Sequence, residues 1–357
     1  MKIGILTFYI ADNYGALFQA LASKYYLESI GHEAYIINHL NKNNININFF
    51  LKSPSALSNL KFFIKQMIRY PFLRRRYNLF SNFVQEYLKP YNGKWKYEPN
   101  DFDCFYVGSD QIWNPLYKNE YIPIFFCQFP GANNKKCIAY SASMGINYIP
   151  QKLYSTLILY LKRFSTISVR EETTKRLISP LVNIPIEVTI DPTFLLTKEQ
   201  WLKLFPPSKD KKYGSYIVVF EVRHSKLTDK LANLISQNYG YEILKIPSSI
   251  DFKDKRTYKT LNPTNFISTI ANAKFVITTS FHGTAFSLIC RIPFYSIETQ
   301  ANDNRIKDLL YSCGAHDRMI NQIPDKITNQ LDWNTISQKL NIYIDNSKNY
   351  LRASLQD

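Results

Sequence analysis

The sequence predicts an α/β protein made of two successive units in which strands and helices alternate. Three observations predict this fold class. Short apolar runs that suit buried parallel strands recur along the chain, and segments with helical periodicity separate most of them. The alternation starts again after a helical stretch that follows residue 150. The 357 residues also exceed the length that a single hydrophobic core usually serves, so two domains are expected.

The first unit begins with a strand expected over 2–8, a helix over 15–30 and a second strand over 33–38. Gly31 ends the helix, since glycine readily takes the left-handed conformation found after helix C-termini. A basic segment over 57–80 comes next. Further strands are expected near 104–107 and 137–141, so this part of the chain has the pattern of repeated βαβ units.

The second unit follows a helix expected from 150 to about 164, and no glycine- or serine-rich linker marks the boundary. Strands are then expected at 167–169, 186–190, 216–220, 241–246, 275–277 and 294–297. The expected organisation is a first domain over 1–164, a second over 165–330, and a helical segment over 331–357 that packs back on the first domain.

The composition indicates a cytoplasmic protein with reduced thiols. No apolar run approaches the length of a membrane-spanning helix, and residues 1–10 lack the layout of a signal peptide. The cysteines are odd in number and widely spaced, which favours buried thiols over disulfides or a zinc site. They are Cys104, Cys127, Cys137, Cys290 and Cys313.

The formal net charge of +16 predicts attraction to an acidic partner. The densest basic stretch is 57–80, which has no acid and many large apolar residues. A helix broken at Pro71 could present Lys61, Lys65, Arg69 and Arg76 on one face, beside Arg74 and Arg75. Two interpretations stay open: a helix that docks on an anionic membrane surface, and a solvated basic helix packed on its own domain. Nucleic acid is not expected, because no nucleic-acid-binding motif accompanies the charge.

The segment 274–297 contains the strongest candidate for a catalytic residue, His282. An apolar run ends at 277, N-cap residue types including Ser280 follow, and a second apolar run starts at 285, so His282 falls in the first turn of a helix. Unpaired N–H groups and the helix dipole favour phosphate or carboxylate there. Gly283 would let a ligand approach the backbone, and Thr284 flanks it. The alternative is a histidine that is hydrogen-bonded to a neighbouring carbonyl.

His282 is expected to be neutral in the free protein and protonated beside an anionic ligand. A helix N-terminus disfavours the imidazolium by about 0.3–1 kcal/mol. One phosphate charge about 4 Å away, at an effective dielectric constant near 20, favours it by ~4 kcal/mol. This behaviour suits a general acid.

Parallel sheets bind ligands at the carboxyl ends of their strands, so the residues that follow each expected strand are further candidates. Two domains with facing strand ends would gather them around one cleft. Asp110 could act there as a base or be the N-cap of a turn. The candidates of this kind are Asn13, Tyr14, Gly15, Ser109, Asp110, Gln111, Arg170, Asp191, Arg223 and His282.

Arg170 is the strongest candidate for binding an anion. Ser168 and Glu171 fit a capping box, which would place Arg170 in the first turn of a helix beside free N–H groups. Its planar guanidinium suits a carboxylate or phosphate. The alternative is an ion pair with a surface acid. A similar box over 197–200 is interpreted as structural only.

Motifs of several other enzyme classes are absent. The sequence contains no G-x-G-x-x-G, P-loop, H-E-x-x-H or G-x-S-x-G motif, and its five histidines show no metal-ligand spacing. These absences argue against a dehydrogenase, a P-loop ATPase, a zinc hydrolase or a serine esterase. No metal or redox cofactor is expected.

Taken together and in order, several short motifs resemble the polysaccharide pyruvyl transferase family over about 3–319. They are NYGALFQA, VGSDQIWNP, SASMG, SVREETT, DPTFLL, TTSFHGTAFSL and DNRIKDLL. The resemblance implies a GT-B-like pair of Rossmann-like domains facing across a cleft, with the acceptor on the first domain and the donor on the second. It also implies transfer from phosphoenolpyruvate to a sugar of a surface polysaccharide, such as an exopolysaccharide or capsule, or to its lipid-linked precursor, with the ketal as product.

The resemblance also implies roles for particular residues. The motif histidine corresponds to His282, as acid or base, and the donor-binding arginine corresponds to Arg170. Some family members carry a basic residue shortly before the histidine, where this chain has Ser280 and a phenylalanine. Arg223, Arg291 and Arg305 are candidate replacements, and Arg305 is the first choice because it starts an expected helix.

Two other functions remain open on the sequence alone. A GT-B glycosyltransferase that uses a nucleotide sugar would also bind anions at helix N-termini of its second domain. A non-catalytic, membrane-associated scaffold for glycan assembly would use the segment 57–80. In the family interpretation, a lipid-linked acceptor would place the protein at the inner face of the membrane as a peripheral protein.

Overall fold

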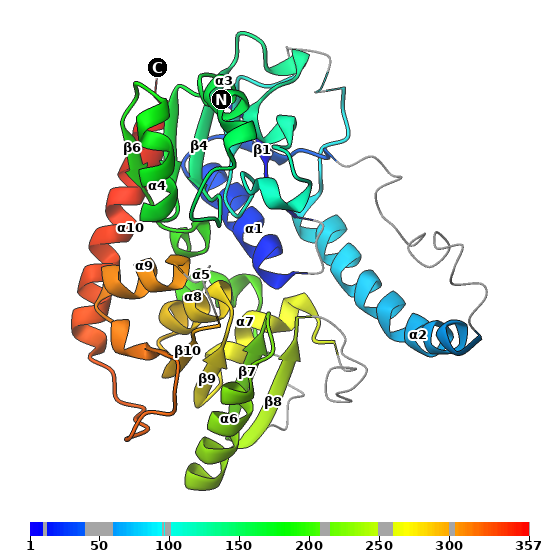
Figure 1. Ribbon diagram of the computed structural model, residues 1–357, viewed down its shortest axis with the longest axis vertical. Coiled ribbons are helices and arrows are strands. Elements are labelled where there is room, and N and C mark those ends of the chain that lie inside the picture. The colour runs from blue at the N-terminus through cyan, green and yellow to red at the C-terminus, as the bar shows by residue number, and fades with distance from the viewer. Residues whose placement is uncertain are drawn as a thin grey trace.

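A computed structural model describes residues 1–9, 13–39, 60–94, 96, 101–207, 215–248, 260–299 and 304–356, without the side chains of residues 60–66, 68, 69 and 117. The described residues form two parallel sheets surrounded by helices (Figure 1). The predicted α/β class with two Rossmann-like units is therefore confirmed.

The first sheet has six strands in the order β2-β1-β3-β4-β5-β6, and every neighbouring pair is parallel. Its central strands are apolar runs buried along nearly their whole length, as helices on both faces of a parallel sheet require. The strands are β1 Lys2–Leu6, β2 Glu33–Ile36, β3 Cys104–Val107, β4 Lys136–Ala142, β5 Thr166–Val169 and β6 Ile186–Val188.

The second sheet has five strands in the order β11-β10-β9-β7-β8, again with parallel pairs. The two-residue strand at its edge was not predicted. The strands are β7 Tyr216–Glu221, β8 Glu242–Pro247, β9 Phe275–Thr278, β10 Phe294–Ile297 and β11 Met319–Ile320.

The expected boundary between residues 164 and 165 is wrong as a division of the strands. Ile167 of β5 pairs with β4, and β6 pairs with β5, so both strands complete the first sheet. The chain passes to the second sheet only between Val188 and Tyr216. Periodicity detects each strand, but it carries no information about which strand is its neighbour.

The helices are α1 Tyr14–Ser29, α2 Leu60–Phe83, α3 Tyr154–Leu161, α4 Glu172–Ile178, α5 Lys198–Leu204, α6 Lys226–Tyr239, α7 Pro263–Ala271, α8 Phe281–Cys290, α9 Asn304–Cys313 and α10 Trp333–Leu355. Nearly all residues of α8 and most of those of α1 are buried, which places both helices in the interior.

An aromatic core joins the two units. The ring of Phe18 in α1 lies 5.7 Å from Trp201, 5.5 Å from Phe266 and 5.4 Å from Phe286, measured between ring centroids. Phe266 and Phe286 belong to α7 and α8 of the second unit. Aromatic pairs at such distances add to the burial of apolar area, so this core fixes α1 against the second unit.

Helix α2 extends away from the body of the molecule and continues through Pro71 (Figure 1). The break expected at Pro71 is therefore wrong. Pro71 is exposed, so the carbonyl that it leaves without a helical partner can bind water instead. Residues 57–59 of the basic segment, and the side chains of Lys61, Lys65 and Arg69, lie outside the described residues.

Helix α10 runs alongside both units (Figure 1). The hydroxyl of Ser347 accepts a hydrogen bond from the backbone N–H of Ile190 at 2.9 Å, and Lys348 lies over the ring of Tyr26 in α1. The C-terminal helix therefore packs on the first unit.

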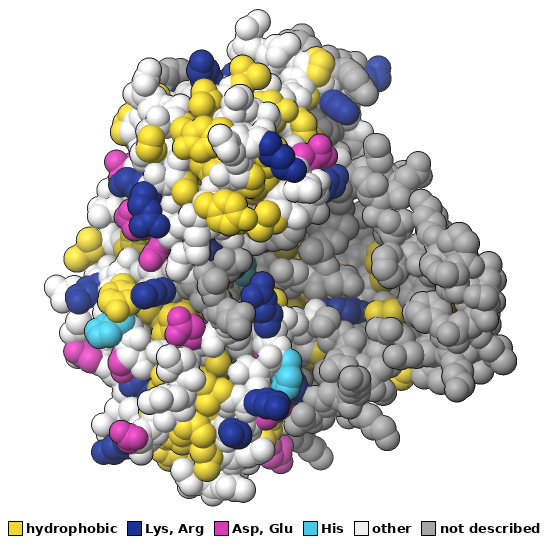
Figure 2. All heavy atoms as spheres, in the orientation of Figure 1, with side chains coloured by type: hydrophobic (Ala, Val, Ile, Leu, Met, Phe, Trp, Pro, Cys, Tyr) yellow, Lys and Arg dark blue, Asp and Glu magenta, His cyan; other side chains and the backbone are white. Residues whose placement is uncertain are grey.

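Two expectations from composition can be examined in the described part of the chain. The cysteines are all buried and unpaired, as predicted. No helix among the described residues is long and apolar enough to cross a membrane. On the face shown in Figure 2, Lys and Arg side chains occur on both units and do not gather into one patch.

Candidate active site

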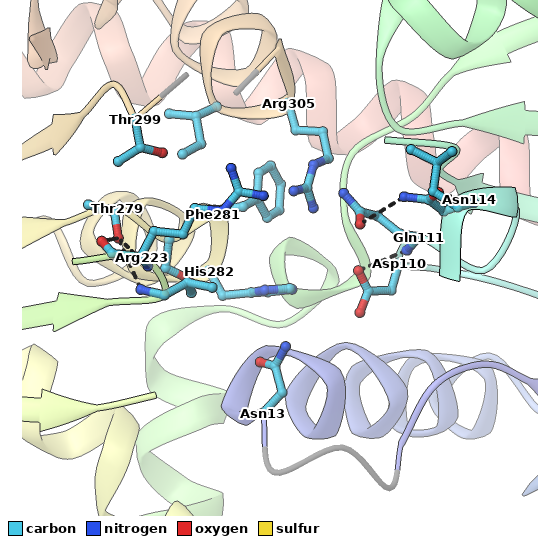
Figure 3. A pocket seen from close by; sticks show the side chains of 14 residues that line it. Asn13, Asp110, Gln111, Asn114, Arg223, Thr279, Phe281, His282, Thr299 and Arg305 are labelled. Atoms are coloured by element: carbon cyan, nitrogen blue, oxygen red, sulfur yellow. Dashed lines mark hydrogen bonds between the residues drawn. The ribbon is translucent and has the colours of Figure 1, made fainter. Parts of the chain in front are cut away.

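A cavity of about 390 Å³ lies between the two units, where the strands of both sheets end. Its walls carry residues that follow β1, β3, β7, β9 and β10 (Figure 3). The arrangement follows from the parallel sheets, whose carboxyl ends face one another across the space. The lining residues are Asn13, Asp110, Gln111, Asn114, Leu116, Val222, Arg223, Thr279, Ser280, Phe281, His282, Thr299, Arg305 and Ile306.

His282 stands in the first turn of α8, as the sequence predicted. Ser280 is the N-cap, and its hydroxyl accepts a hydrogen bond from the N–H of Gly283. The His282 side chain is 7% exposed and reaches across to the first unit, where it lies directly over Gly15 of α1. A Cβ atom at Gly15 would stand 1.9 Å from Nδ1 of His282. The absence of a side chain at Gly15 is what makes room for the imidazole.

Three charged groups of the first unit lie near the imidazole. Arg170 and Asp191 are buried, and Asp110 lines the cavity. Arg170 Nη1 donates to Oδ2 of Asp191 at 2.9 Å, and its Nη2 donates to Oδ1 of Asp110 at 3.3 Å. Nε2 of His282 lies 3.8 Å from the same Oδ2 of Asp191. The groups come from the ends of β5, β6 and β3, so the histidine of one unit completes a charge network of the other.

Burial lowers the pKa of His282, the charges of Asp191 and Asp110 partly raise it again, and those of Arg170 and Arg305 lower it further. The net shift is downward, which agrees with the expectation of a neutral imidazole in the free protein. Burial raises the pKa of Asp110 and Asp191, but Arg170 and the charged form of His282 outweigh it and hold both pKa values below the ordinary range. Both carboxyls are therefore ionised at neutral pH.

The cavity has a cationic side formed by Arg305 and Arg223 (Figure 3). Arg305, in the first turn of α9, lies with its guanidinium carbon 5.9 Å from the ring centre of Phe281, and Arg170 lies 4.7 Å from the same ring. Arg291, the third candidate, is exposed at the opposite end of α8 and does not line the cavity. The structure thus places two of the three candidate replacements at the site.

The position predicted for Arg170 needs correction. Ser168 lies within β5, where its hydroxyl bonds to β4, and α4 begins only after Glu171 without a side-chain cap. The predicted capping box is therefore wrong, because the strand continues through Ser168. Arg170 does not line the cavity, and it pairs with the buried Asp191 and the cavity-lining Asp110 rather than with an acid on the outer surface. The similar box at Thr197 is present as predicted.

Four other candidates lie in the interior instead of on the cavity wall. A Cβ at Gly283 would meet Thr278 at 2.1 Å, so this glycine allows close packing and not the approach of a ligand. Thr284 is hydrogen-bonded to Ser296. Tyr14 packs on Phe266 and donates to the carbonyl of Leu261 in the second unit, and Ser109 donates to the carbonyl of Ser141 and to Asp191.

Sequence reasoning did not single out several lining residues. Thr279 follows β9 directly and Thr299 comes shortly after β10, so the rule that favours strand ends would have found them if applied to every strand. Asn114 lies in the quoted motif VGSDQIWNP. Phe281 gave no signal, because its contacts with two arginines depend on residues far apart in the sequence.

Among the described residues, Glu221, His224 and Asp229 have ligand atoms within 4.8 Å of one another, a spacing that could hold a metal ion. The ammonium of Lys245 lies 3.4 Å from Glu221 and 3.9 Å from Asp229. The two carboxylates therefore already have a cationic partner.

Comparison with known proteins gives one family. A family model described as polysaccharide pyruvyl transferase matches residues 13–300. A search of curated proteins finds no match.

Similar solved structures include UDP-GlcNAc 2-epimerase from Methanocaldococcus jannaschii, with 13% identity, 96% of this chain and 99% of that chain covered, and a TM-score of 0.40. The UDP-GlcNAc 2-epimerase from Neisseria meningitidis has 11% identity and a TM-score of 0.46, and the match covers 100% of this chain and 95% of that chain. The E. coli heptosyltransferase WaaC with ADP has 10% identity and a TM-score of 0.43, and the match covers 96% of this chain and 100% of that chain. At these values the likeness carries no information about activity.

Proposed function

The chain belongs to the polysaccharide pyruvyl transferase family, and we propose that it transfers a pyruvyl group from phosphoenolpyruvate to a sugar of a surface polysaccharide or its lipid-linked precursor. The observation that carries this proposal is the cavity between the units. It combines a buried imidazole, a carboxylate and two arginines on its walls. These are the groups that protonation of an enol, activation of a hydroxyl and binding of an anion require.

The proposed reaction joins the donor to two hydroxyls of one sugar. His282 gives a proton to the methylene carbon of phosphoenolpyruvate, which becomes a methyl group, and positive charge develops at C2. One sugar hydroxyl adds to C2 and loses its proton to Asp110. The C2–O bond to phosphate then breaks, the second hydroxyl adds to C2, and its proton is taken up by the departing phosphate. The products are the ketal and inorganic phosphate, so the balance requires no oxidant, and the proton on Asp110 returns through solvent to His282 before the next turnover.

The proposed donor site uses the N-terminus of α8 and the cationic side of the cavity. Ser280, Arg223 and Arg305 line the cavity beside His282, where phosphate and carboxylate groups would find N–H donors and positive charge. Arg170, the donor-binding arginine by family resemblance, would have to exchange a carboxylate partner to contact the donor directly. On the acceptor side, Asn13, Gln111 and Asn114 offer amides that can hydrogen-bond to sugar hydroxyls.

The proposed function is tested by incubating the protein with glycan acceptors and either phosphoenolpyruvate or a nucleotide sugar. Release of inorganic phosphate together with a new ketal methyl signal in the proton NMR spectrum of the glycan is expected with phosphoenolpyruvate. Release of a nucleoside diphosphate, without phosphate release from phosphoenolpyruvate, would instead establish the glycosyltransferase alternative.

Replacing Arg305 with glutamine is expected to raise KM for phosphoenolpyruvate about 10- to 100-fold, because a charged hydrogen bond contributes roughly 1.5–3 kcal/mol. The variant Arg291→Gln is the matched control, since it also removes one positive charge but lies at the far end of α8. Steady-state kinetics with varied donor measures both. Equal KM values for the two variants would remove Arg305 from the donor site.

We further propose that α2 docks on an anionic membrane surface and brings the cavity to a lipid-linked acceptor. Met67 is 61% exposed, and Arg74 and Arg75 are exposed, so this part of the helix offers apolar and basic groups together. Arg76 does not belong to this exposed group. It is 1% exposed and donates to the carbonyls of Pro247 and Ser248, which fastens α2 to the second unit.

The double variant Arg74→Gln, Arg75→Gln is expected to bind vesicles that contain anionic lipid about tenfold more weakly or worse, since each basic residue near such a surface contributes about 1 kcal/mol. The double variant Lys226→Gln, Lys230→Gln is the control, because it removes the same charge from exposed positions on α6. Flotation with the vesicles compares them. Equal binding by both double variants would exclude docking through α2.

A further inference from the structure

The two carboxylate oxygens of Asp191 have separate partners. Oδ1 accepts hydrogen bonds from the N–H and the hydroxyl of Thr193, at 3.0 and 2.8 Å. Oδ2 accepts from Arg170 at 2.9 Å and from Ser109 at 3.3 Å, and it faces Nε2 of His282 at 3.8 Å. The side chain is fully buried, and it does not line the cavity.

The local sequence explains why the carboxylate is held in this orientation. Asp191 follows β6 and is the N-cap of a 3₁₀ turn, Pro192–Leu195, which starts with proline. The capping bonds from Thr193 hold Oδ1, and Oδ2 then faces Arg170 and His282. The backbone just before it is also tied, because Ile190 donates to Ser347 of α10.

We propose that Asp191 is the positioning residue of the site: it holds Arg170 in place and supplies the negative charge that supports a proton on Nε2 of His282. The titration of His282 in this proposal does not depend on the donor, whereas the effect on turnover rests on the proposed function.

The charges around His282 support this role. Asp191 and Asp110 face the imidazole from the ends of β6 and β3, while Arg170 and Arg305 face it from the end of β5 and from α9. Arg170 is paired with both carboxylates, so these three groups carry one net negative charge while His282 is neutral. Protonation of His282 neutralises that charge. Asp191 has the larger effect of the two carboxylates on His282.

An asparagine at this position replaces one carboxylate oxygen, which accepts hydrogen bonds, with an NH₂ group, which donates them. The N–H and hydroxyl of Thr193 both donate, so the amide oxygen of the variant would stay in the place of Oδ1. The amide NH₂ would then stand where Oδ2 stands, facing the N–H groups of Arg170 and the hydroxyl of Ser109. Donors would face donors, and the negative charge beside His282 would be lost.

Asp191→Asn is compared with Ser109→Ala by NMR titration of the free protein, selectively labelled on its histidine rings. Ser109→Ala removes one hydrogen bond to Oδ2 but keeps the charge. His32, His39, His224 and His316 serve as internal references. We expect the titration midpoint of His282 to move to lower pH in Asp191→Asn and to stay near the wild-type value in Ser109→Ala, with the reference midpoints unchanged in both.

Turnover is measured in parallel, if the wild type uses phosphoenolpyruvate. Asp191→Asn is expected to lower kcat at least about tenfold, and Asp191→Glu, which restores the charge, to recover part of it. The proposal is overturned if the midpoint of His282 is the same in Asp191→Asn and wild type, or if Ser109→Ala moves it as far. Failure of the wild type to use phosphoenolpyruvate would reject the proposed function but leave the titration result standing. If Asp191→Asn does not fold, the same titration is made on Asp191→Ala, which removes the charge without placing a donor against Arg170 and Ser109. A His282 midpoint unchanged in Asp191→Ala rejects the role.

Discussion

Replacing His282 with alanine is expected to lower kcat for pyruvyl transfer by about 10²–10⁴-fold, the usual contribution of a general acid. His282 lines the cavity, and its imidazole is buried, neutral in the free protein and directed at Asp110 across the space (Figure 3). The fold should survive, because the imidazole lines the cavity instead of filling a hydrophobic core. Phosphate release and thermal unfolding are the measurements.

The pH dependence of the wild type gives a second readout for His282. A general acid must be protonated, so activity is lost as pH rises through its pKa. Burial lowers that pKa in the free enzyme, whereas the donor's negative charge raises it in the complex. The decline of kcat/KM should therefore begin at lower pH than the decline of kcat, after allowance for ionisation of the donor itself. His316→Ala is the control variant, since His316 is exposed and distant in the sequence. Near-normal transfer by His282→Ala would exclude it as the acid.

Replacing Gly15 with alanine is expected to displace the imidazole of His282 and to cost about 10²-fold or more in kcat, as misplacement of a reacting group by about 1 Å can do. The added Cβ would stand 1.9 Å from Nδ1 and 2.4 Å from Cγ of the ring. Helix propensity alone favours alanine over glycine by about 1 kcal/mol, so without the clash the variant would be the more stable protein. A lower melting temperature would show that the clash dominates.

The double variant Gly15→Ala, His282→Ala separates the clash from other effects of the alanine. Removing the imidazole removes the atoms that the new Cβ would meet, so the Gly15→Ala change should cost little stability in this background. The two substitutions should be non-additive by about 0.5–3 kcal/mol in chemical denaturation, as for residues in contact. Additive losses would mean that Gly15 is needed for a reason unrelated to His282.

The features that the sequence predicts correctly are mostly local: they are strands, helices and helix starts that depend on neighbouring residues. Strands such as β3 and helices such as α1 follow from short apolar periodicities, and the position of His282 follows from Ser280 and the apolar run after it. The strand-end rule then found Asp110, Arg223 and others without knowledge of the sheets. These inferences succeed because each depends on a few consecutive residues.

The errors share one cause, which is that they concern partners distant in the sequence. Ser168 satisfies a capping pattern, but pairing with β4 and β6 keeps it within a strand. Arg76 belongs to a basic run, yet two carbonyls of the second unit bury it. Gly283 appeared suited to a ligand, but the side chain of Thr278 fills the space.

The sequence by itself determined the α/β class and the family, and it singled out His282, Arg170 and Asp110 as candidate site residues, because these lie in contiguous motifs. Only the tertiary structure decided how they act together. It placed Arg170 between two carboxylates, set His282 over Gly15 from the opposite unit, and brought Arg305 to the cavity. The reason is physical: burial and the distances between charges set the pKa of His282, and both depend on packing between the units rather than on neighbouring residues.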